Sequence, residues 1–222
     1  MNKRFFLIGD IHGQYDKVKN LTGLISSEYL EGDLIIFLGD YIDRGPQSFE
    51  VIEHLILLSK CYDIVFLMGN HEDMFLRFYT TGSNYKHYLM NGGGATIKSY
   101  MKNCGDFTLP ETHKIFFNNL KLFYESEDFI AVHAGLNPEV DDIKKQSAYD
   151  LLWIREEFYY SKKKWDKTII FGHTPVSYLN SDSNIYVDNK RNIIGIDTGA
   201  MVENFPLTCL IWPEKRVIQV QK

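Results

Sequence analysis

The chain has 222 residues, and its 24 Lys and Arg against 29 Asp and Glu give a formal net charge of −5. This length suits one domain with a sizeable core, and an apolar fraction of 45% excludes a disordered chain. The net negative charge argues against the basic surface that a nucleic-acid-binding protein needs. It still permits a phosphorylated substrate that a few local arginines hold.

The apolar runs are far shorter than the ~20 residues of a membrane helix, and the first run is too short for a signal peptide. Cys61, Cys104 and Cys209 are widely spaced and odd in number. A disulfide framework is therefore not expected, and a reducing compartment fits better. We predict a cytoplasmic monomer that binds neither a membrane nor nucleic acid.

Short apolar runs that end before Gly or His predict strands at 5–8, 34–38, 64–68, 129–132 and 168–171. Continuous apolar runs of this length are typical of strands buried on both faces. Between the first three runs, apolar residues recur at helical spacing within 18–25 and 51–58. The alternation predicts βαβ units and a layered α/β fold.

The strand pattern is absent between residues 77 and 119, where short helices are predicted at 85–90, 95–101 and 111–119. We interpret this stretch as a helical insertion in a single domain spanning 1–222. The C-terminal part predicts four more strands, at 184–187, 193–196, 207–212 and 217–220, with turns at 189–190 and 213–214.

Polar residues follow the predicted strands, and they are Asp10, His12, Asp40, Asn70, His133 and His173. Each alone is explained by a turn or a helix cap, but six at strand exits are hard to explain that way. Side chains at the carboxyl ends of parallel strands converge on one crevice. Oxygen and nitrogen donors without thiolate suit Mn, Fe or Zn, and one carboxylate can bridge two ions ~3.5–4 Å apart.

Five blocks in the chain resemble, in order, the signatures of the PPP-type metal-dependent serine/threonine phosphoprotein phosphatases of the calcineurin-like metallophosphoesterase superfamily. They are Gly9-Asp10-Ile11-His12-Gly13, the run from Gly39 to Gly45, Gly69-Asn70-His71-Glu72, His133-Ala134-Gly135-Leu136 and Gly172-His173-Thr174-Pro175. Asn91-Gly92-Gly93 and the runs 152–155 and 196–200 are similar to the small bacterial or phage-type branch. The resemblance implies a layered α/β/β/α sandwich.

The resemblance also implies a role for each matching residue. Asp10, His12 and Asp40 would hold a first divalent ion, and Asp40, Asn70, His133 and His173 a second, with Mn²⁺ expected and Fe or Zn as alternatives. Arg44, Arg155 and Asn70 would bind phosphate oxygens, which match the planar fork of a guanidinium. His71, oriented by Asp43, would protonate the leaving alkoxide, a contribution of ~10²–10⁴-fold, while hydroxide between the two cations attacks phosphorus in line.

Some features remain open at this point. Arg155 is also explained as a solvated helix residue paired with a neighbouring glutamate, and the aromatic and lysine-rich run 158–165 as the end of an amphipathic helix. Asp197 could lie near the metals or cap a turn. The 201–205 loop departs from the glycine-rich turn usual in the branch, and it should border the site.

The leading hypothesis is a phosphomonoesterase acting on phosphoserine or phosphothreonine in proteins, with phosphotyrosine as a further option. An alternative is a dinucleoside tetraphosphate hydrolase. Relatives of the diadenosine tetraphosphatase type usually lack the acid of the Asp43-Arg44 pair and often carry Asp where Glu72 stands, which favours the phosphoprotein hypothesis. A second alternative is a catalytically silent module that binds phosphorylated partners, but a lost ligand or a lost His71 would indicate it, and all are present.

Overall fold

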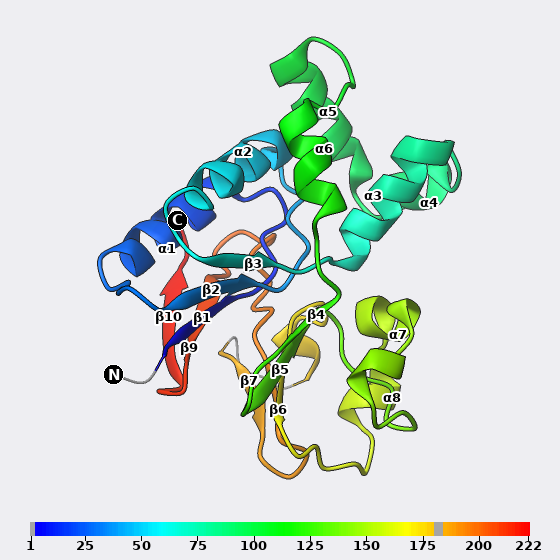
Figure 1. Ribbon diagram of the computed structural model, residues 1–222. Helices are drawn as coiled ribbons and strands as arrows, with labels where there is room; N and C mark the ends of the chain where they lie inside the picture. The colour runs from blue at the N-terminus through cyan, green and yellow to red at the C-terminus, as the bar shows by residue number, and fades with distance from the viewer. Residues whose placement is uncertain (1–2, 180–183) are drawn as a thin grey trace.

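The computed structural model describes residues 3–179 and 184–222, and within them the strands form two five-stranded sheets (Figure 1). The first sheet has the order β10-β9-β1-β2-β3, and the second β4-β5-β6-β8-β7. The first is built from β1 (Phe5–Ile8), β2 (Leu34–Phe37), β3 (Ile64–Phe66), β9 (Leu207–Trp212) and β10 (Arg216–Val220). The second is built from β4 (Phe123–Glu125), β5 (Phe129–Val132), β6 (Thr168–Phe171), β7 (Tyr186–Asp188) and β8 (Ile193–Gly195).

Each sheet contains three neighbouring strands that run parallel. β1 pairs with β2 and β2 with β3, while β5 pairs with β6 and β6 with β8. Parallel neighbours need a crossover, and α1 (Tyr15–Ser26) and α2 (Ser48–Leu58) supply the first two. The carboxyl ends of β1, β2 and β3 therefore lie at one edge, which is the arrangement that the sequence predicts for the polar residues.

Every central strand is buried on both faces, as the continuous apolar runs predict. Leu7, Ile36, Ala131 and Ile170 belong to one cluster between the two sheets. The alternate residues of the first sheet pack against α1 and α2, and those of the second against α7 (Ala148–Trp153) and α8 (Glu156–Tyr159). The layers are thus helix, sheet, sheet and helix, which confirms the predicted α/β/β/α sandwich.

The helical stretch begins earlier than predicted. α3 (Asn70–Thr81) starts directly after β3, and α4 (Tyr85–Met90), α5 (Gly93–Cys104) and α6 (Glu111–Asn118) follow. The predicted start near residue 77 is wrong because Gly69 is the N-cap of α3 and the Glu72 side chain closes its capping box. Buried aromatic side chains of these helices join the same cluster as β1, so their core is continuous with that of the first sheet.

Two other features differ from the expectations. The short edge strand β4 was not predicted, because Phe-Tyr-Glu is neither a continuous apolar run nor a regular alternation. In the 158–165 run the helix ends at Tyr159, after which Trp165 is buried against Phe158 with Lys163 over its ring. Among the described residues, no helix is long and apolar enough to cross a membrane.

Candidate metal centre and active site

The six polar residues that follow the strands lie together at the edge where the parallel strands end. Their side chains are buried, with between 0 and 5% of each residue exposed. The side chains form two groups, and within each group the candidate ligand atoms all lie within 4.8 Å of one another. One group is His12, Asp40 and His71, and the other is Asp40, His133 and His173. Asp40 belongs to both groups, which is the geometry that its predicted role as a bridge requires.

Hydrogen bonds to main-chain carbonyls determine which ring nitrogens can bind a cation. His133 Nδ1 lies 2.8 Å from the carbonyl oxygen of Leu38, and a carbonyl can only accept, so this nitrogen carries the proton. His133 Nε2 then holds a lone pair, yet it lies 2.9 Å from Asn70 Oδ1, which is also an acceptor. Two acceptors that face each other at this distance fit a shared cation.

The other two predicted imidazole ligands, His12 and His173, also have a ring nitrogen with a lone pair that is available to a bound cation. His12 Nδ1 lies 3.1 Å from the carbonyl oxygen of Ile42, which leaves the lone pair on its Nε2, an atom 3.5 Å from Asp40 Oδ2 and 3.2 Å from Arg44 Nη1. His173 Nδ1 lies 2.9 Å from Asn70 Oδ1, and its Nε2 is buried without a hydrogen-bond partner in the described part of the chain. An orphaned buried ring nitrogen fits a site that a bound group completes.

The electrostatics favour neutral imidazoles around a charged carboxylate. Burial lowers the pKa of His12 to about 3, and it also lowers the pKa values of His133 and His173. Burial alone would raise the pKa of Asp40, but the surrounding imidazoles outweigh it and hold this pKa below its usual range. Neutral nitrogen and anionic oxygen donors without thiolate fit divalent metal ions such as Mn²⁺ or Zn²⁺.

Two further carboxylates crowd the same edge. Burial, followed by the charges of Asp197 and Asp40, raises the pKa of Asp10 well above its usual value, and burial raises that of Asp197 to about 6. Asp10 accepts the main-chain N–H of His173 at 3.0 and 3.2 Å, so it joins the β1 and β6 loops. Neither group of candidate ligand atoms contains Asp10, and its place at the first ion stays a prediction. Asp197 both caps a turn, accepting the N–H of Gly199, and lies near this cluster.

The backbone of the site adopts an uncommon conformation. His12, Asp40, Asp43, Arg44 and His173 all have positive φ, between 48° and 70°. Such angles are unfavourable for residues with a side chain, and where they cluster they commonly mark functional sites. The first two loops also approach closely: a Cβ on Gly13 would lie 2.6 Å from the carbonyl oxygen of Gly45, which explains why both loops end in glycine.

The predicted acid pair is in contact. His71 Nδ1 lies 2.7 Å from Asp43 Oδ2, and both side chains are almost fully buried. His71 Nε2 lies on the other side of the ring, 3.9 Å from Asp40 Oδ2. Burial alone would lower the pKa of His71, but the carboxylates of Asp40 and Asp43 outweigh it and raise the pKa. The Nε2 atom of His71 thus faces the candidate metal ligands, while its Nδ1 contacts Asp43.

Both predicted phosphate-binding arginines lie at the site. Arg44 is exposed, with Nη1 3.2 Å from His12 Nε2 and 2.8 Å from the sulfur of Met201, so the 201–205 loop borders the site as expected. Arg155 Nη1 donates to the Thr174 hydroxyl at 2.8 Å. Burial is the main cause of the lowered pKa values of His133 and His173, and the positive charge of Arg155 lowers them further. Arg155 therefore lies beside two of the predicted metal ligands, and its role in phosphate binding stays a prediction.

Glu72 joins two of the loops, which sequence reasoning did not foresee. Its fully buried carboxylate accepts the main-chain N–H groups of Asp40 and Tyr41 at 2.8 Å and that of Gly69 at 2.9 Å. A signal was available, because a glutamate three residues after a helix N-cap is the usual partner in a capping box.

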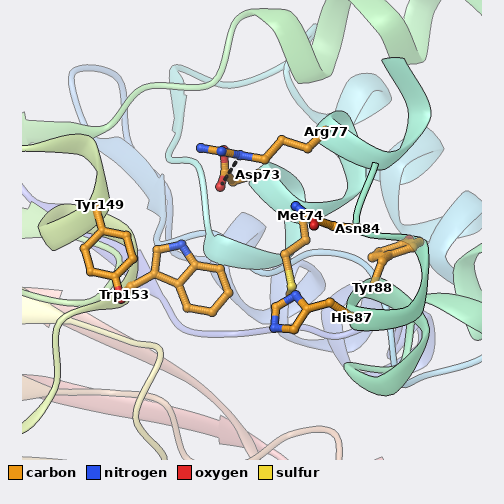
Figure 2. Close-up of a pocket in the computed structure, with 8 residues that line it drawn as sticks. All are labelled: Asp73, Met74, Arg77, Asn84, His87, Tyr88, Tyr149 and Trp153. Carbon is orange, nitrogen blue, oxygen red and sulfur yellow. Dashed lines mark hydrogen bonds and ion pairs between the residues drawn. The ribbon is translucent and has the colours of Figure 1, made fainter. Parts of the chain in front are cut away.

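A pocket next to the metal ligands was also missed. Figure 2 shows Tyr149 and Trp153 of α7 across from Met74, Arg77 and His87 of α3 and α4, and Asp73, Asn84 and Tyr88 complete the lining. The pocket holds about 170 Å³. Trp153 connects it to the metal ligands, because its ring lies edge-on to that of His173 at 6.3 Å between centroids.

The fold and the clustered ligands define a metal-dependent phosphoesterase. The model of the calcineurin-like phosphoesterase family matches residues 3–198, and the chain belongs to this family. Bis(5′-nucleosyl)-tetraphosphatase PrpE of Anoxybacillus flavithermus is 28% identical, over 96% of this chain and 92% of its own. Serine/threonine-protein phosphatase 2 of Salmonella typhimurium is 30% identical, over 84% and 87%. A crystal structure provisionally named a diadenosine tetraphosphatase has a TM-score of 0.71 at 20% identity, covering 98% of this chain and 93% of its own, which shows the fold alone.

We predict that Glu72→Gln lowers the free energy of unfolding by about 1–3 kcal/mol, because an amide NH₂ would face a main-chain N–H that now has an acceptor. Chemical denaturation measures the change. Glu127→Gln is the control, since this exposed glutamate should alter stability by less than about 0.5 kcal/mol. Equal stability of the two variants would contradict the role of Glu72.

We predict that Asp40→Ala abolishes both metal binding and turnover, because one carboxylate belongs to both ligand groups. Elemental analysis of the purified, metal-loaded protein measures the bound ions. The exposed Asp16→Ala should bind metal as the unchanged protein does. Two equivalents retained by the Asp40 variant would exclude the bridging role.

Proposed function

We propose that this phosphoesterase hydrolyses phosphate monoesters with alkoxide leaving groups, namely phosphoserine and phosphothreonine in proteins. The observation that carries the proposal is the 2.7 Å contact between His71 and Asp43, with His71 Nε2 facing the metal ligands. A serine alkoxide leaves poorly unless it is protonated, so a positioned acid contributes most to this class of ester.

Each residue of the site has a separate role in the proposed reaction. Two divalent ions, Mn²⁺ in our proposal, would polarise phosphate oxygens and lower the pKa of water when bound. The guanidinium groups of Arg44 and Arg155 bind the phosphate oxygens, together with Asn70. As a water oxygen attacks phosphorus and the bond to the ester oxygen breaks, His71 Nε2 gives its proton to that oxygen, and Asp43 holds the ring by its Nδ1–H.

The second candidate is asymmetrical hydrolysis of a dinucleoside tetraphosphate. Whole-length similarity to proteins of that name favours it, and so does the pocket beside His173. Tyr149 and Trp153 stack with an angle of 17° between their rings, and their faces suit a nucleobase. The bond cleaved would be an anhydride with a good leaving group, to which the His71–Asp43 pair adds little.

A side-by-side assay separates the two candidates. The protein is stripped of metal and reloaded with Mn²⁺ or Zn²⁺, and kcat/KM is measured on phosphoserine peptides and on diadenosine tetraphosphate. We expect the peptide to be preferred, with activity restored by Mn²⁺. Turnover of the dinucleotide at least about tenfold better than that of every peptide tried would make the second candidate the function.

We predict that His71→Asn keeps the metals but slows phosphoserine hydrolysis by about 10²-fold or more, because the leaving alkoxide loses its proton donor. An aryl phosphate should be affected less, since a phenolate leaves without much protonation. The measurement is kcat on both substrates, with bound metal as the control. Equal losses on the two would count against His71 as the acid.

We predict that Trp153→Ala lowers kcat/KM for diadenosine tetraphosphate by about tenfold, since base–aromatic stacking contributes ~1–3 kcal/mol. Hydrolysis of a phosphoserine peptide should fall much less. Trp153→Phe keeps an aromatic face and should retain most of the dinucleotide activity. If Trp153→Ala lowers kcat/KM equally for the dinucleotide and the peptide, and Trp153→Phe lowers dinucleotide hydrolysis as much, the pocket does not bind a base.

A further inference from the structure

The Asp43 carboxylate uses its two oxygens for different partners. Oδ2 contacts the His71 ring, whereas Oδ1 accepts the Tyr88 hydroxyl at 2.8 Å and the Thr96 hydroxyl at 2.6 Å. Tyr88 comes from α4 and Thr96 from α5, and all three residues are fully buried. Figure 2 shows Tyr88 on α4, at the end of the pocket away from Trp153.

The direction of each hydrogen bond in this network follows from simple counting. A carboxylate only accepts, so the single hydroxyl proton of Thr96 goes to Asp43 Oδ1. The Asp43 N–H in turn donates to Thr96 Oγ1 at 2.9 Å. Ser48 Oγ lies 2.9 Å from Thr96 Oγ1 and must donate to it, because the Thr96 proton is already used. Thr96 therefore holds both the backbone and the carboxylate of Asp43.

The turn between α4 and α5 also supports the unusual backbone of this loop. Asp43 and Arg44 are consecutive residues with φ of 70° and 66°, and the Arg44 N–H donates to the Gly92 carbonyl at 3.2 Å. A Cβ on Gly93 would lie 2.4 Å from the Tyr88 ring, so glycine is needed there to seat this tyrosine. The helices inserted between β3 and β4 thus contact both residues of the Asp43-Arg44 pair.

We propose that Tyr88 and Thr96 are positioning residues that hold the Asp43 carboxylate in the orientation from which it aligns His71. The proposal rests on the proposed role of His71 as the acid. Without the two hydroxyls, the carboxylate can rotate about its Cβ–Cγ bond, and the His71 ring loses the partner that directs its Nε2. The loss then falls on proton transfer to the leaving group and spares the metal ligands.

The test compares substrates that need the acid to different degrees. For Tyr88→Phe we expect kcat on a phosphoserine peptide to fall about tenfold or more at similar KM, because small displacements of a catalytic group are costly. On 4-nitrophenyl phosphate, kcat should change by less than about threefold. Thr96→Val should behave in the same way, whereas Thr96→Ser, which keeps the hydroxyl, should retain the activity. All variants are assayed with Mn²⁺ and equal bound metal.

Tyr100→Phe is the matched control. Tyr100 is an equally buried tyrosine of α5, but its hydroxyl contacts His113 Nδ1 at 2.7 Å, away from Asp43. Loss of the Tyr100 hydroxyl should change kcat on the phosphoserine peptide and on 4-nitrophenyl phosphate by the same factor. The proton resonance of the His71–Asp43 contact, assigned by its loss in His71→Asn, gives a second measurement, and it should shift in Thr96→Val but not in Tyr100→Phe.

Several results would overturn the proposal. Equal losses on both substrates in Tyr88→Phe and Thr96→Val would leave the hydroxyls a structural role only, and so would an unchanged resonance. If Tyr88→Phe does not fold, the comparison of Thr96→Val with Thr96→Ser still tests whether a hydroxyl that binds Asp43 is needed for phosphoserine hydrolysis. If His71→Asn itself shows no dependence on the leaving group, the proposed acid fails. If His71→Asn shows a dependence on the leaving group but Tyr88→Phe and Thr96→Val do not, the positioning role of the two hydroxyls fails and the proposed acid stands.

Discussion

The site depends on one buried carboxylate that is neither a predicted ligand nor a predicted acid. Glu72 accepts main-chain N–H groups from the loop after β2 and from the turn after β3. These bonds hold the backbone of Asp40 against the first turn of α3, from which Asn70 and His71 extend. Asp40, Asn70 and His71, the predicted shared ligand, second ligand and acid, are thereby set at fixed separations by one side chain.

This arrangement is costly in isolation. Five residues of the site have left-handed backbone conformations, and several carboxylates and imidazoles lie beyond the reach of bulk water. The surrounding structure has to compensate, and it does so with layers of apolar side chains on both faces of each sheet. A cation bound between Asp40, His133 and Asn70 would relieve the remaining electrostatic conflict, in which acceptor atoms face one another.

Much of the fold was predictable, because strands buried on both faces leave continuous apolar runs that any short window reveals. The clustering of the six polar residues was predictable for a related reason, since each closely follows such a run, and the contact of Asp43 with His71 came from the resemblance of the motifs. The edge strand β4 lacks that signal. The bonds from Tyr88 and Thr96 to Asp43 join residues 45 and 53 positions apart, and no local pattern encodes a tertiary contact of that kind.

Asp43, the predicted partner of the acid, is supported by helices that carry none of the predicted metal ligands. The predicted ligands follow strands of both sheets, whereas the Asp43 carboxylate accepts hydrogen bonds from α4 and α5, which lie between β3 and β4 in the chain. Changes in those helices can therefore alter how well the acid is aligned while the metal ligands keep their positions. In the proposed mechanism only poor leaving groups need the acid, so changes in α4 and α5 would alter the preference between monoesters and anhydrides without moving the predicted metal ligands.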